Sequence, residues 1–143
     1  MGYIVKAVIA WAMGIVPYFE IYVAVPASIG MGLDPVSAVF WAGLGNFTAV
    51  PVVVVFYSQL CKVPRLKNWL LSLPEGRYKK TVDKYGDFFM FILTPLAGIW
   101  VAAAVARAVG FPKPRLYVLS ALCIILYGSV TALLTVMGIE LIF

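Results

Sequence analysis

Three polar side chains lie inside long apolar stretches of the sequence and could carry chemistry there. The first is Glu20, which follows Pro17 within an apolar run from Tyr3 to Leu33 whose only other charge is Lys6. A charged side chain at the centre of a bilayer costs about 2.5 to 3.5 kcal/mol on insertion scales, so it normally faces a partner, a cavity or a transport path. Glu20 is therefore the first candidate for binding a proton, a cation or a substrate.

Arg107 is the second candidate and the only basic residue well inside another apolar stretch. It is the natural partner of Glu20 if the two stretches meet, although a position near a membrane surface would also let its side chain reach the headgroups. Glu20 has structural alternatives as well: it could form an ion pair or cap broken backbone. Because desolvation disfavours the charged form of a carboxyl group, a protonated Glu20 is a further alternative.

Asn46 is the third candidate. It follows Gly45 and precedes Pro51, and a proline at that position cannot donate a helical hydrogen bond to the carbonyl one turn earlier. Polar groups therefore collect within an otherwise apolar helix. The amide of Asn46 could stabilise a kink in that helix or line a pathway.

The composition predicts an integral membrane protein. The 143 residues are 64% hydrophobic and 12% charged, against roughly 25% charged in a soluble domain. There is no histidine, and the two cysteines, Cys61 and Cys123, are too far apart in the sequence to suggest a metal cluster. We expect no metal, no cofactor and no enzymatic activity, because no nucleophile and base occur at a motif spacing. The net charge of +5 does not indicate nucleic-acid binding, since basic residues flanking membrane segments meet lipid headgroups.

Four apolar segments must position these side chains: 3–33, 36–60, 85–111 and 116–143. A spanning helix needs about 20 residues, so the first and third segments are too long for one crossing and too short for two. Prolines or glycines interrupt them. We therefore predict an all-α integral membrane fold with two re-entrant helical hairpins (3–33 and 85–111) and two full transmembrane helices (36–60 and 116–143). The helix breaks predicted to line the site are at Pro17, Pro26, Pro51, Pro95 and Gly98.

The two halves of the chain repeat weakly. Pro17 and Pro95 are 78 positions apart, and so are Gly32 and Gly110. Residues 1–60 are thus predicted to form a first repeat and residues 85–143 a second, joined by a connector over residues 61–84.

The connector is basic and should be cytoplasmic by the positive-inside tendency. It contains seven basic and two acidic residues. From Pro64 to Pro74, apolar residues recur with helical spacing and predict an amphipathic interfacial helix; they are Leu66, Trp69, Leu70 and Leu73. If both hairpins are re-entrant, each half crosses the membrane once in net and the halves have opposite orientations. Such inverted repeats are typical of secondary transporters.

The order of motifs resembles a known family across nearly the whole chain. The motifs are Pro17-x-x-Glu20, Ala24-x-Pro26, Gly30 to Pro35, Gly45-Asn46 with Pro51, Lys84-Tyr85-Gly86 and Pro95-x-x-Gly98. Together they resemble the small multidrug export proteins. The second half is also distantly similar to the DedA (VTT-domain) membrane proteins. The resemblance implies a transporter-like fold, with either drug export or movement of lipids or lipid carriers as the activity.

Our leading interpretation is a proton- or ion-coupled exporter of small cationic or amphipathic molecules, acting as a homodimer in the cell membrane. Glu20 would be the coupling carboxylate, with Asn46 and Arg107 as further substrate- or ion-binding residues. One alternative is a lipid or lipid-carrier translocase in which Arg107, Lys113 and Arg115 contact phosphate. A second is a non-transporting membrane scaffold in which Glu20 is structural. The small residues expected at a dimer interface are Ala38, Ala42, Gly43, Gly128 and Ala132.

Overall fold

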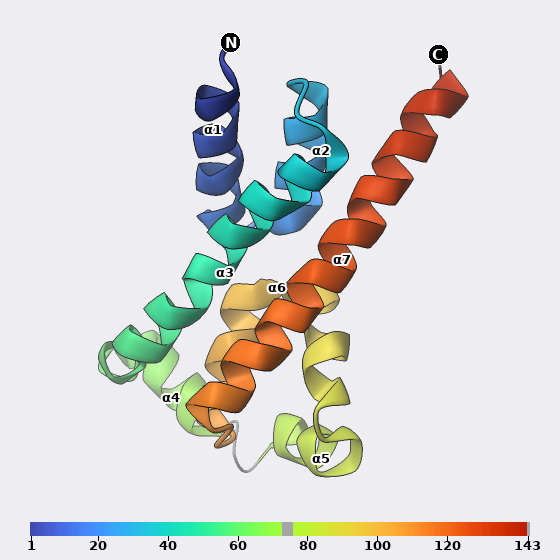
Figure 1. Cartoon of the computed structure of the whole chain (residues 1–143). Coiled ribbons are helices and arrows are strands. Elements are labelled where there is room, and N and C mark those ends of the chain that lie inside the picture. The colour runs from blue at the N-terminus through green and yellow to red at the C-terminus, as the bar shows by residue number, and fades with distance from the viewer. Residues whose placement is uncertain (73–75, 143) are drawn as a thin grey trace. The chain divides into compact units, whose positions relative to one another are not determined.

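The computed structural model describes residues 1–72 and 76–142, and helices dominate them (Figure 1). Over these residues the chain forms α1 (Tyr3–Ile15), α2 (Glu20–Gly30), α3 (Pro35–Leu60), α4 (Pro64–Ser72), α5 (Arg77–Tyr85), α6 (Phe88–Ala108) and α7 (Lys113–Ile142). The all-α prediction is confirmed for this part of the chain.

The chain divides into two compact units. Unit 1 comprises Met1–Thr48 and Ile124–Phe143, and unit 2 comprises Ala49–Cys123. The boundaries fall inside α3 and inside α7, so each unit contains one end of both long helices. Unit 1 adds α1 and α2 to them, and unit 2 adds α4, α5 and α6.

Three apolar stretches are long enough to cross a membrane: Pro35–Leu60, Phe88–Ala108 and Lys113–Gly138. Many large apolar side chains on them point outward, among them Val55, Ile125 and Leu134. Exposed apolar surface of this extent is suited to a lipid environment. The chain is a membrane protein, as its composition predicts.

In unit 1, α1 and α2 form a helical hairpin. They are joined by residues 16–19, which contain Pro17, and they lie side by side in Figure 1. The Nζ of Lys6, on α1, donates a hydrogen bond of 3.1 Å to the carbonyl of Gly32, just after α2. The start of α1 therefore lies beside the end of α2, and the two helices run in opposite directions.

In unit 2, α6 is not a straight helix. Gly98 has φ 82° and ψ 165°, which interrupts the helical backbone. A straight helix would separate Phe89 from Phe111 by about 33 Å, at 1.5 Å per residue. Their ring centroids are 6.3 Å apart, and Arg115 forms a salt bridge with Asp87. The halves of α6 thus fold back on each other as a second hairpin. Entry of either hairpin into a bilayer stays a prediction.

The end of the first hairpin recurs at the end of the second with the offset of 78 residues. Gly32 and Gly110 have φ values of 85° and 93°, which favour glycine. The backbone N–H to carbonyl bonds around them also match: Met31 to Ala27, Gly32 to Ile29 and Leu33 to Ser28, then Val109 to Val105, Gly110 to Arg107 and Phe111 to Ala106. This is the hydrogen-bonding pattern of a Schellman C-cap. The local backbone therefore repeats, whereas opposite orientation of the repeats stays a prediction.

The structure corrects two of the predicted helix breaks. Pro26 and Pro51 lie inside α2 and α3, which continue through them. A proline removes a single backbone donor, and a helix that is otherwise well hydrogen-bonded and packed tolerates this loss. The chain reverses instead at residues 16–19 and at Gly98, three residues after Pro95.

The connector contains one helix more than the sequence suggested. The predicted amphipathic helix is α4, whose described part ends at Ser72; Leu73 and Pro74 of the prediction lie outside the described residues. The second helix, α5, was missed because its residues are mostly polar. It ends at Tyr85 and is followed by Gly86, whose φ of 54° favours glycine.

Replacing Gly98 with alanine tests the break in α6. A residue with a Cβ loses about 1 to 3 kcal/mol at the positive φ and extended ψ of Gly98, so Gly98→Ala should lower the thermal unfolding midpoint in detergent by several degrees. Gly30→Ala is the matched control, because Gly30 lies in α2 with open space around an added Cβ. Equal midpoints for the two variants would contradict the reversal at Gly98.

Candidate functional site

Glu20 lies at the tip of the first hairpin, as the first residue of α2. Its side chain is buried, with 6% of its surface exposed, whereas the neighbouring Tyr18 is 96% exposed. The φ of Glu20 is 43°, an uncommon value for a residue with a side chain. The helix dipole favours a negative charge at this position. The structure thus places a buried carboxylate at the positive end of a short helix.

Asn46 holds the end of α1 from the neighbouring helix. It is fully buried on α3, and its Nδ2 donates a hydrogen bond of 3.1 Å to the carbonyl of Gly14. Gly14 lies in the last turn of α1, where carbonyls have no partner within the helix. The side-chain amide of Asn46 therefore bonds to α1 rather than to a kinked backbone within α3, its own helix.

Two glycines bring α1 and α3 into backbone contact beside Asn46. A Cβ on Gly14 would lie 2.1 Å from the carbonyl oxygen of Ala42, and a Cβ on Gly45 would lie 2.0 Å from that of Trp11. Only glycine fits either position. Gly45 was noted in the sequence as a neighbour of Asn46, but its partner on α1 could not be identified without the fold.

The side-chain oxygen of Asn46, Oδ1, is the atom that suggests a binding function. It is buried and has no hydrogen-bond partner among the described residues. An unsatisfied buried acceptor costs about 1 to 3 kcal/mol, so such an atom needs an explanation. It belongs to the same compact unit as Glu20. Unit 1 therefore contains a buried carboxylate and an unsatisfied amide oxygen, both suited to a proton-bearing group or a small cation.

Arg107 belongs to unit 2 and has local partners there. Its Nη1 donates a hydrogen bond of 3.0 Å to the carbonyl of Phe111, and its Cζ lies 5.8 Å from the ring centroid of Tyr57. Its Nε is buried and has no hydrogen-bond partner in the described parts of the chain. Because Glu20 is in the other unit, the pairing of Arg107 with Glu20 stays a prediction.

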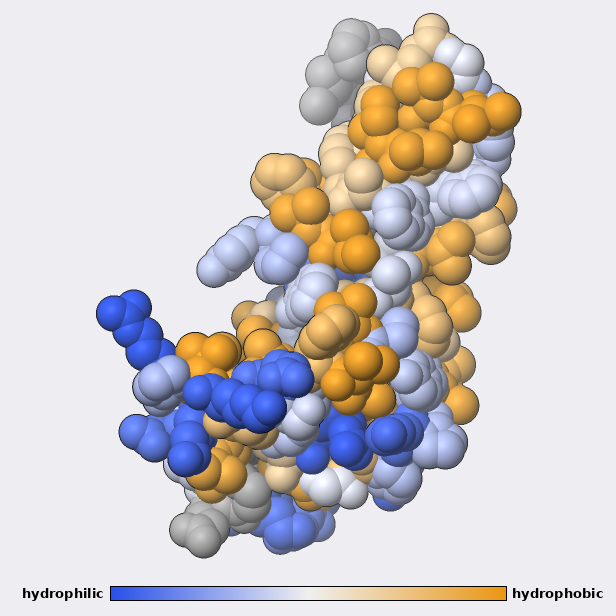
Figure 2. Space-filling view, turned by 90° about the vertical axis from the view of Figure 1, so that its left-hand side faces the viewer, coloured by the Kyte–Doolittle hydropathy of each residue, from blue (hydrophilic) through white to orange (hydrophobic). Residues whose placement is uncertain are grey.

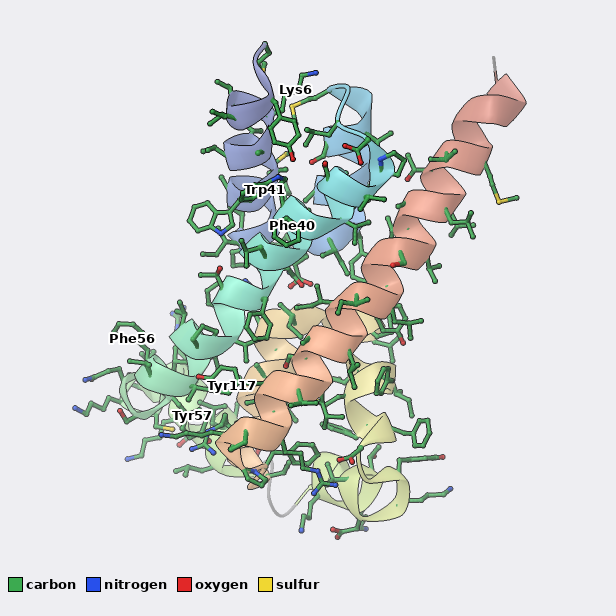
Figure 3. The ribbon with its side chains drawn as sticks, viewed as in Figure 1. Lys6, Phe40, Trp41, Phe56, Tyr57 and Tyr117 are labelled. Atoms are coloured by element: carbon green, nitrogen blue, oxygen red, sulfur yellow. The ribbon has the colours of Figure 1, made fainter. Side chains whose placement is uncertain are left out.

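A polar network stabilises the open end of the first hairpin, opposite the tip. The Nε1 of Trp41 donates to the hydroxyl of Tyr3 (3.0 Å), which donates to the hydroxyl of Ser37 (3.2 Å). The N–H of Ser37 donates in turn to Oδ1 of Asp34 (2.9 Å), which caps the start of α3. Figure 3 shows Lys6 and Trp41 in this region.

Hydrogen bonds from Ser37 lower the pKa of Asp34 below its ordinary value. The cap is therefore fully present above the pKa of an unfolded aspartate, and it is lost as the pH falls through the lower pKa of the folded state. At neutral pH the network is intact and fixes α1 against the start of α3.

Comparison with known proteins identifies the class. Residues 20–134 match the family described as "Putative small multi-drug export protein". The match covers well over half of the chain, so the chain belongs to this family, as the order of its motifs suggested. It begins at Glu20 and includes Asn46 and Arg107. Searches of curated proteins and of solved structures gave no match. The similarity to DedA proteins stays a prediction.

Removing the amide of Asn46 tests its role at the end of α1. Asn46→Ala leaves a buried carbonyl without its donor, so the free energy of unfolding in detergent should fall by about 1 to 3 kcal/mol. Thr48→Ala is the control, since the hydroxyl of Thr48 bonds only within its own helix, to the carbonyl of Leu44. A loss no larger than that of the control would show that Asn46 does not hold α1.

Proposed function

We propose that this protein is a small secondary transporter that exports cationic or amphipathic molecules and uses Glu20 as its coupling carboxylate. The observation that carries the proposal is the burial of Glu20 at the first hairpin tip in a member of a drug-export family. An ionisable side chain in an apolar chain is costly and usually functional. The substrate crosses the membrane without chemical change.

The groups around the hairpin tip support a coupling cycle. In the charged state, Glu20 holds a cation with help from the Oδ1 of Asn46 and from the negative end of α1. In the protonated state, the carboxyl group is neutral and releases the cation. Proton and cationic substrate thus exclude each other on one side chain, which is the condition for exchange. Short helices that end at membrane depth serve the same purpose in other secondary transporters.

The repeated hairpin ends support the membrane arrangement that we propose. Both hairpins enter the bilayer and return to the side from which they came, and α3 and α7 cross it in opposite directions. The connector with α4 and α5 is cytoplasmic. Two copies of the chain form the transporter, since one chain of this size offers little protein to shield both hairpins.

Lipid translocation is a second candidate. It is favoured by one observation: Arg107 is only partly buried and its Nε has no hydrogen-bond partner among the described residues, so its guanidinium group has donors left for a phosphate. A lipid translocase would move labelled phospholipids between leaflets without a proton gradient. The two functions therefore predict different fluxes.

Glu20→Gln tests the coupling role. In proteoliposomes with a proton gradient, the unaltered protein should move a cationic dye such as ethidium, and Glu20→Gln should reduce this flux by roughly tenfold or more, because an amide cannot exchange a proton. Asp83→Asn is the matched control: Asp83 is an exposed carboxylate that pairs with Lys79. Its flux should equal that of the unaltered protein.

The same vesicles separate the alternatives. Movement of a fluorescent phospholipid without movement of the dye would replace export by lipid translocation. Dye flux that survives Glu20→Gln would remove Glu20 from the mechanism. If neither flux exists in vesicles where the protein is folded, the scaffold interpretation replaces both.

Cysteine labelling tests the membrane arrangement. In a Cys61→Ser, Cys123→Ala background, we expect Lys113→Cys to react with an impermeant reagent only from the cytoplasmic side, like Lys67→Cys. Val36→Cys should react only from the opposite side; Val36 is well exposed at the start of α3. Labelling of Lys113→Cys from outside would show that α6 does not return to the side it came from.

A further inference from the structure

Unit 2 contains an apolar cavity of about 220 Å³ that the transport proposal does not use. It lies between the second half of α3, the amphipathic α4 and the second half of α6. The side chains that line it are all apolar; those that carry the argument are Phe56, Leu66, Trp69, Leu70, Trp100 and Ala104. A cavity of this character excludes a soluble anion or metal ion and suits a hydrocarbon chain.

The helix that covers the cavity carries basic residues on either side of its apolar face. α4 directs Leu66, Trp69 and Leu70 to the cavity, and Leu70 is almost completely buried. Arg65 and Lys67 stand beside Leu66 in the sequence and are exposed. In Figure 2 the most hydrophilic side chains gather at the end of unit 2 where α4 and α5 lie, next to apolar ones. An amphipathic helix with this pattern lies at the surface of a membrane.

Arg107 places a positive charge on the cavity's side of α6. It follows Ala104, a cavity residue, by three positions, so both lie on the same helix face. Its Cζ lies over the ring of Tyr57, the neighbour of the cavity residue Phe56, and Figure 3 shows both aromatic side chains near the end of α3. The guanidinium group has five donors, and its buried Nε has no hydrogen-bond partner in the described structure.

From this arrangement we propose that unit 2 binds an anionic phospholipid, with an acyl chain in the cavity under α4 and its phosphate on Arg107. Arginine is well suited to phosphate because it donates two parallel hydrogen bonds. The lipid supplies both an apolar chain for the cavity and acceptors for the arginine. Lys62 and Arg65 flank the cavity residues Leu60 and Leu66 in the sequence and add to the preference for negative charge. The lipid stays bound, so the proposal does not depend on transport.

Quenching of tryptophan fluorescence tests the site in the full chain. Of the four tryptophans, Trp69 and Trp100 line the cavity, so Trp11→Phe and Trp41→Phe leave only these two as reporters. The protein is reconstituted in phosphatidylcholine with increasing fractions of dibrominated phosphatidylglycerol, and then in the reverse mixture. We expect the anionic lipid to quench more than its mole fraction predicts, with a binding preference of about fivefold over phosphatidylcholine.

Three variants in that background identify the residues responsible. Arg107→Gln should bring the preference close to one, whereas Arg107→Lys should retain much of it. Ala104→Leu fills the cavity and should reduce the preference without changing any charge. Lys80→Gln is the control, because Lys80 is an exposed base on α5 outside the cavity lining, and its preference should be unchanged.

The outcomes are decisive in either direction. Equal quenching by the two lipids in the unaltered cavity would overturn the proposal. So would a preference that survives both Arg107→Gln and Ala104→Leu, or one that falls equally in Lys80→Gln, since the attraction would then be that of the basic surface in general. If Arg107→Gln does not fold, Ala104→Leu alone decides between these results.

Discussion

The structure depends on satisfying the backbone at the ends of short helices in an apolar chain. A polar group left without a partner in lipid costs several kcal/mol, so a broken helix persists only if other groups bond to its ends. Asn46 bonds to the last turn of α1 through the carbonyl of Gly14. Lys6 bonds to the carbonyl of Gly32 after α2, and Arg107 bonds to the carbonyl of Phe111 after α6. Lys6 and Arg107, two of the charged residues inside the apolar segments, therefore stabilise helix C-termini, where a positive charge is favourable.

The same requirement explains where the two halves agree and where they differ. Their hairpin ends share one hydrogen-bonding pattern and a glycine with positive φ. At the reversals, Gly98 has a φ of 82°, and the equivalent position in the first half is Glu20, with a φ of 43°. Glycine accepts a positive φ without strain and glutamate does not; a residue with a side chain at positive φ costs about 1 kcal/mol or more. The preference for glycine at a positive φ is met by Gly98 in the second half and is not met by Glu20 in the first half. A departure of this kind indicates that Glu20 has a function.

Three features could be predicted from the sequence, because each follows from residue type and segment length. They are the helical fold, the positions of the two reversals and the identity of the buried acid. Pro17 and Gly98 marked the turns, and Glu20 stood out in an apolar run. The partner of Asn46 could not be predicted, since the hydrogen bond to Gly14 spans 32 positions and requires two glycines to bring α1 onto α3. Pro26 and Pro51 do not break their helices, because the hydrogen bonds and packing of the rest of each helix outweigh the single donor that a proline removes. The cavity in unit 2 could not be predicted either, because the residues that line it come from three helices that only the fold brings together.

α3 runs from one proposed site to the other, with Pro51 between them. Asn46 lies on it in unit 1, and the cavity residues Phe56 and Leu60 lie on it in unit 2. Pro51 stands between them and removes a helical hydrogen bond close to the boundary of the units, after Thr48. Prolines are where helices bend, because the missing bond and the ring both loosen the local geometry. Under the two proposals, a displacement of α1 that accompanies a change at Glu20 would act on α3 through the hydrogen bond of Asn46 to Gly14, and a bound lipid would act on the other end of the same helix. Coupling between export and lipid composition would therefore need no element besides α3.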